Sequence, residues 1–191
     1  MGIQLAFDML TTENQLLLRD LAYKSIRHGL EAGKALEINS AQYPAELRPK
    51  KATFVTLHRN KELRGCIGIL KPVRPLAEDV AYNAWAAAFT DSRFMPLNEA
   101  ELDDLDIHIS ILGTAEEMDF TSEDDLLQQI RPGTDGLILE EGFNKGTFLP
   151  SVWESLPDSR EFLNHLKLKA GLPAGYWSDN IKVRCYTVEE F

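Results

Sequence analysis

The feature that most constrains the fold is a change of hydrophobic period along the chain. Over residues 12–36 apolar side chains recur about every fourth position, which predicts an amphipathic helix. Over residues 53–70 they alternate instead, in two runs that flank a polar stretch at 58–62. Alternation on both sides of a short polar stretch predicts a β-hairpin. Helices joined to hairpins, without a regular strand–helix–strand order, predict the α+β class.

The rest of the chain continues this mixture. A chain of 191 residues has the size of one large domain, or of two lobes that share a core. We expect one domain over residues 1–191, with a mainly antiparallel sheet and flanking helices. Its further helices are expected over 76–89, 98–105, 122–130 and 158–170, and its further strands over 106–111, 136–140, 147–149 and 181–188.

Charge and cysteine content exclude several classes of protein. The chain has 20 basic and 30 acidic residues, a net charge of −10, which disfavours binding to a nucleic-acid backbone. Its two cysteines, Cys66 and Cys185, can build neither a disulfide framework nor a four-cysteine metal site. Residues 1–8 lack a basic leader, and no apolar run is long enough to span a membrane. We expect a cytoplasmic protein with reduced thiols.

The segment around Cys66 is the strongest candidate for chemistry. In an uninterrupted strand Arg64, Cys66 and Gly68 share one face, so a cation stands roughly 7 Å from the thiol. A nearby cation increases the fraction of thiol present as reactive thiolate. Gly65 and Gly68 indicate close approach of a ligand or of another part of the backbone. A lone cysteine also serves as a small core residue, and both interpretations stay open.

The hairpin has a predictable register. If Asn60 and Lys61 form the turn, Val55 lies opposite Cys66, and residue 57 lies opposite residue 64. A slip of one residue would turn Cys66 to the other face of the sheet.

Polar residues elsewhere allow two interpretations each. Asp91 and Arg93 lie with Phe94 in a loop, where they either contact a substrate or tie the loop to the body. His58 is expected to be a solvated residue at the mouth of the hairpin. His108 is either a structural or a site residue on an alternating strand. No metal-binding or nucleotide-binding motif is present, so we expect no metal and no cofactor.

Taken together, several segments resemble the AMMECR-type domain family. They are Phe54-Val55-Thr56-Leu57, Leu63-Arg64-Gly65-Cys66-Ile67-Gly68, Asp91-Ser92-Arg93-Phe94-Met95-Pro96, Leu105 to Leu112, Leu149-Pro150-Ser151-Val152 and Lys169-Ala170-Gly171-Leu172. The resemblance implies a larger and a smaller lobe around a cleft. Its microbial members look like component A of the AmmeMemoRadiSam system, which implies a Memo-type protein and a radical S-adenosylmethionine (SAM) protein as partners.

The resemblance also implies a site. Cys66 and Arg64 would be catalytic, and the substrate-binding residues would be Gly65, Gly68, Asp91, Arg93 and Phe94. Two functions remain open: an enzyme that uses Cys66 on a small anionic substrate, and a non-catalytic adaptor that docks onto the other components. The chain lacks the three-cysteine motif of the radical enzyme, so it is not that component.

Overall fold

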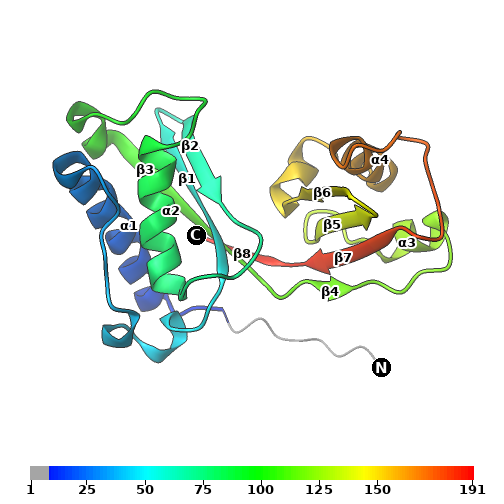
Figure 1. Ribbon diagram of the computed structural model, residues 1–191, viewed down its shortest axis with the longest axis horizontal. Helices are drawn as coiled ribbons and strands as arrows, with labels where there is room; N and C mark the ends of the chain where they lie inside the picture. Colours follow the sequence, from blue (N-terminus) through cyan, green and yellow to red (C-terminus); the bar gives the residue numbers. More distant parts are fainter. Residues whose placement is uncertain (1–8) are drawn as a thin grey trace. The chain divides into compact units, whose positions relative to one another are not determined.

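The computed structural model describes residues 9–191, so the expected lack of a leader at residues 1–8 lies outside the described part. The chain forms two compact units, which we describe separately. One contains the residues up to Leu112 together with Glu189–Phe191, and the other contains Gly113–Val188. Each has a four-stranded antiparallel sheet and helices, so the α+β prediction is confirmed (Figure 1).

The first unit has a sheet in the order β2-β1-β3-β8. In the described residues its elements are α1 (Thr12–Ala32), the 3₁₀ turns η1 (Ser40–Gln42) and η2 (Ala45–Leu47), β1 (Ala52–Arg59), β2 (Glu62–Gly68), α2 (Leu76–Phe89), η3 (Glu99–Asp104), β3 (Leu105–Leu112) and β8 (Val188–Glu190). The strand β8 comes from the end of the chain, and Ile109 exchanges two backbone hydrogen bonds with Phe191.

Local signals begin and end the long first helix. The Thr11 hydroxyl accepts a hydrogen bond from the Asn14 amide and caps α1. Gly33 ends the helix in the left-handed conformation, with a φ of 71° that glycine adopts at little cost. Leu18, Ala22 and Ile26 on this helix are fully buried, as their spacing predicted.

Alternation along β1 and β3 separates the two faces of the sheet. Val55, Leu57 and Ile109 are fully buried in a cluster with residues of α1 and α2. We call this side the helix face and the opposite side the second face. Residues between these positions, such as Thr56 and His108, therefore belong to the second face.

The predicted register of the hairpin was wrong by one residue. Thr56, not Val55, lies opposite Cys66, and Leu57 pairs with Gly65. Near the turn the predicted register does hold, since Arg59 pairs with Glu62. A β-bulge between these regions leaves Arg64 without a partner on β1, and a bulged residue breaks the strict alternation of a strand. The face assignment that placed Arg64 beside Cys66 therefore fails.

The second unit has a sheet in the order β4-β7-β5-β6. Its elements are β4 (Glu116–Glu117), α3 (Glu123–Gln129), β5 (Gly136–Glu141), β6 (Asn144–Phe148), the 3₁₀ turn η4 (Pro150–Glu154), α4 (Ser159–Lys169) and β7 (Lys182–Tyr186). Its core surrounds Phe162 and Leu166 of α4. The strand expected over 181–188 is two strands, β7 and β8, which belong to different sheets.

No helix within residues 9–191 is long and apolar enough to cross a membrane.

Candidate functional site

Cys66 lies on the second face of the first sheet, outside the hydrophobic cluster beneath the helices. Its side chain is half-buried, and its sulfur lies 3.2 Å from the Thr56 hydroxyl oxygen, within hydrogen-bond distance. Cys185 differs, since it packs against the apolar core of the second unit. Burial raises the pKa of the Cys185 thiol, and the nearby Asp135 carboxylate raises it further.

The main chain of Cys66 is held from outside the sheet. Its amide donates a 2.9 Å hydrogen bond to Asp91, and its carbonyl accepts a 3.4 Å hydrogen bond from the Arg93 guanidinium. Because these groups point away from β1, Cys66 and Thr56 form a non-hydrogen-bonded pair. In such pairs the side chains approach most closely.

Asp91 and Arg93 bind each other as well as β2. Arg93 donates to both oxygens of Asp91, from Nε at 2.9 Å and from Nη2 at 2.7 Å. The Arg93 guanidinium and the Cys66 amide hold the pKa of the Asp91 carboxyl far below its usual range, so the group is ionised. We call these two side chains the Asp91–Arg93 clasp. The pair does tie its loop to the body, one of its two expected roles.

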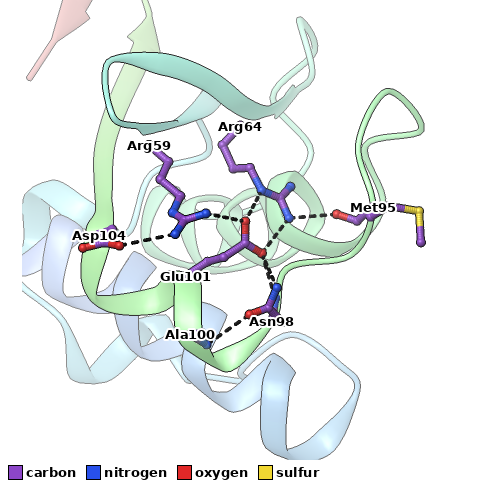
Figure 2. Close-up of polar contacts among 7 residues, drawn as sticks. All are labelled: Arg59, Arg64, Met95, Asn98, Ala100, Glu101 and Asp104. Atoms are coloured by element: carbon purple, nitrogen blue, oxygen red, sulfur yellow. Dashed lines mark hydrogen bonds and ion pairs between the residues drawn. The ribbon is translucent and has the colours of Figure 1, made fainter.

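Arg64 is bound to a carboxylate away from Cys66. Figure 2 shows that its guanidinium forms a fork with Glu101 of η3, with bonds of 2.8 and 3.0 Å, and also donates to the Met95 carbonyl. Arg64 lowers the pKa of Glu101 to about 2. Asn98 donates two further hydrogen bonds to Glu101 and completes a capping box for η3. The positive charge predicted to stand beside the thiol is therefore neutralised elsewhere.

Packing accounts for the two glycines of the motif. A Cβ added to Gly65 would lie 2.1 Å from the carbonyl oxygen of Ala87, so α2 rests directly on this strand. At Gly68 it would lie 2.3 Å from the Thr53 carbonyl oxygen. Both positions require glycine because another part of the backbone lies too close for a side chain. The alanines of α2 make this approach possible.

The loop residue Phe94 lies near both arginines. The guanidinium of Arg64 lies 5.9 Å from the centre of its ring and that of Arg93 lies 5.5 Å from it. Cations at such distances from an aromatic ring are attracted to it, so Phe94 helps to fix this loop.

His108 and His58 lie on the same face of the sheet as Cys66, a relation that the sequence analysis did not predict. His108 is the partner of Thr56 on β3, so it stands one strand beyond Thr56 in the row that starts at Cys66. Its ring bonds to Asp106 at 3.0 Å and meets the ring of His58 edge-on at 5.1 Å between centroids. The alternation of β1 and β3 could have identified this row, but the wrong register of β2 concealed it.

Within residues 9–191, no group of three or more histidine, cysteine or carboxylate side chains is placed to hold a metal ion.

Comparisons with known proteins agree with the motifs. The chain is 40% identical over 168 residues to protein MJ0810 of Methanocaldococcus jannaschii, covering 84% of this chain and 81% of that one. A protein of Thermotoga maritima is 38% identical over 173 residues, covering 89% of this chain and 94% of its own length. The crystal structure of the uncharacterised protein PH0010 from Pyrococcus horikoshii matches with a TM-score of 0.84 at 36% identity, over 95% of this chain and 92% of that one. The AMMECR1 family model matches residues 19–191, so this chain belongs to the AMMECR1 family.

Proposed function

We propose that Cys66 is the reactive thiol of a small-molecule site on the second face of the first sheet. The observation that carries this proposal is the way the residue is held. Its backbone is clamped by the Asp91–Arg93 clasp and its neighbour Gly65 rests on α2, while the thiol itself stays outside the apolar core. A nucleophile acts best when its position is fixed before the substrate arrives.

The structure supports a different set of residues around the Cys66 thiol from the set that the sequence predicted. Thr56 is the group in contact with the sulfur, and its hydroxyl can donate a hydrogen bond to a thiolate. Arg64 binds Glu101 and the Met95 carbonyl, so its role is to tie β2 to η3 and to the loop after α2. For an anionic substrate the better cation is Arg93, whose side chain is 55% exposed. His108, which bonds to Asp106, lies two strands from Cys66 on the same face, so its role would be proton transfer with a bound substrate and not with the thiol directly.

Alkylation kinetics test this proposal. A small alkylating agent should label Cys66 faster than Cys185 between pH 7 and 8, because burial raises the pKa of the Cys185 thiol. Rates for each thiol would be read by peptide mass spectrometry. Thr56→Val should slow labelling of Cys66 several-fold, whereas Arg64→Gln, the control, should leave its rate unchanged. Equal rates for the two thiols in the wild-type protein would refute the proposal.

A second candidate is the adaptor function, and one observation favours it. The loop after α2 is tied to β2 at Cys66 and Arg64, yet it presents Met95 with 81% of its surface exposed. Leu63 on β2 is 40% exposed. Exposed apolar side chains on a well-anchored segment suit protein recognition. The family resemblance suggests a Memo-type protein or a radical SAM protein as the partner.

Binding to purified candidates distinguishes the two functions. An adaptor should bind the Memo-type or the radical SAM protein from the same genome, and Met95→Asp should weaken that binding at least tenfold. The same variant should leave the alkylation rate of Cys66 unchanged. Binding that is lost in Cys66→Ser but retained in Met95→Asp would contradict the adaptor surface.

A further inference from the structure

Two antiparallel segments of the chain connect the two units. The chain passes from the first unit to the second between β3 and β4, and it returns between β7 and β8. In the first unit Ile109 and Phe191 exchange two backbone hydrogen bonds, and in the second unit the Gly113 amide donates a 2.8 Å hydrogen bond to the Thr187 carbonyl. The connection is therefore a two-stranded ribbon with its own ladder of hydrogen bonds.

The register of this ribbon changes next to the bond between Gly113 and Thr187. The following pair along the ribbon joins Glu116 to Cys185. Between that bond and this pair, one strand has two residues, Thr114 and Ala115, whereas the other strand has one residue. Two residues opposite one form a β-bulge, which interrupts the ladder and bends the strand that contains it.

The two sides of the bulge are held differently. Tyr186, the single residue, pairs with Gly136 of β5, and its hydroxyl group donates a 3.0 Å hydrogen bond to the Phe148 carbonyl. In the described part of the chain, neither Thr114 nor Ala115 makes a backbone hydrogen bond. The bulged strand can therefore change its dihedral angles while the opposite residue stays fixed in the sheet of the second unit.

We propose that this bulge is a hinge at which the second unit turns relative to the first while both sheets stay intact. Rotation about the backbone of residues 114–115 breaks no bond of the ladder, because the hydrogen bonds of the ribbon lie on either side of them. Hinges are typically a few residues at the ends of elements that absorb changes in φ and ψ. A two-stranded ribbon also accepts a wider range of twist than a full sheet. The hinge does not depend on the chemistry proposed at Cys66.

The distance between two spin labels reports this motion. Arg27 on α1 and Arg160 on α4 have exposed side chains, so each can be replaced by cysteine and labelled. Cys66→Ser and Cys185→Ser first remove the native thiols. Double electron–electron resonance of the labelled full chain then gives the distribution of distances between the labels. We expect a broad distribution while the bulge is present, since a hinge allows many orientations.

Two variants remove the bulge, one from each strand. Deletion of Ala115 leaves one residue opposite Tyr186, and insertion of one alanine after Tyr186 leaves two residues opposite two. Either change lets one register run through the whole ribbon, and each should narrow the distance distribution at least twofold. Ala115→Ser is the matched control, because it keeps the bulge, and it should leave the breadth unchanged. Circular dichroism checks that each variant is folded, and the insertion serves as the test if the deletion does not fold.

The outcomes separate the hinge from other sources of motion. A narrow distribution in the protein that keeps its bulge refutes the hinge, whatever the variants do. Full breadth in a folded variant without the bulge also refutes it, because the motion then arises elsewhere in the chain. Equal narrowing by Ala115→Ser would show that the side chain at position 115, and not the extra residue, sets the range of distances.

Discussion

At the residue scale, the motif around Cys66 is mainly a set of packing and anchoring positions. Gly65 allows α2 to rest on β2, and Arg64 binds Glu101. Asp91 and Arg93 close the edge of the strand. Within Leu63–Gly68, the Cys66 thiol is the polar side-chain group that lies neither in the apolar core nor in an ion pair.

Gly65 should tolerate no side chain. In Gly65→Ala the new methyl group would overlap the carbonyl oxygen of Ala87, which is backbone and cannot move away cheaply. We expect a loss of about 3 kcal/mol in the free energy of unfolding, measured by urea denaturation. Gly175→Ala is the control, because a Cβ there meets nothing within 4 Å, and it should change stability little. Equal stability of the two variants would contradict this close contact.

The Glu101 carboxylate should make stability depend on pH. Its pKa is lowered from 4.5 to about 2 when folded, so it stabilises the protein fully above pH 4.5. As pH falls from 4.5 towards 2, that contribution, up to about 3 kcal/mol, is lost. In Glu101→Gln the stability should change less over this range than in the wild type. Parallel pH profiles of the two proteins, measured by urea denaturation, would show that Glu101 is not responsible.

At the scale of elements, the loop after α2 depends on a few polar contacts. The Asp91–Arg93 clasp and the bond from Arg64 to the Met95 carbonyl tie this loop to β2. The core strands depend instead on buried apolar side chains such as Val55 and Ile109. Local opening of the loop should therefore cost less free energy than unfolding of the sheet.

Asp91→Asn should loosen this loop selectively. The amide keeps one acceptor but loses the charge that binds Arg93, so residues 90–97 should exchange amide hydrogens faster. The amides of β1 and β3 should keep their protection. An equal loss of protection in both strands would mean that the Asp91–Arg93 clasp supports the whole fold, which is the opposite of this expectation.

At the scale of the whole molecule, the chain leaves the first unit and returns to it. Residues 113–188 form the second unit, and β8 then joins the sheet of the first unit beside β3. Glu189 on β8 binds the Leu10 amide and the Gln15 side chain at the start of α1. Both ends of the second unit are thus attached to the first sheet.

This connectivity leads us to expect one cooperative unfolding transition, as for a single domain. Phe162→Ala, in the core of the second unit, should cost about 4 kcal/mol. It should shift the transition reported by hydrogen exchange in β1 and β3 as well as the one in β5. Two separate transitions, with β1 and β3 unaffected, would show that the units unfold independently.

Local pattern was sufficient for much of the fold. Helical spacing predicted α1, and the helix expected over residues 158–170 is α4. Alternation predicted β1 and β3. These elements depend on neighbours a few residues apart, so the information lies within a short stretch of chain. The family was also recognisable, because its motifs are short continuous segments.

Tertiary structure decided which strands pair with one another and which side chains meet. The bulge at Arg64 changed the register of Cys66, and Arg64 met Glu101, 37 positions further along the chain. The last strand crossed into the other sheet at Thr187, although its alternation continued. Each of these results is a choice among alternatives with similar local energies, which only the packing of distant segments distinguishes. The identity of a strand can be read from its own side chains, whereas its register and its partners depend on the surfaces that it meets.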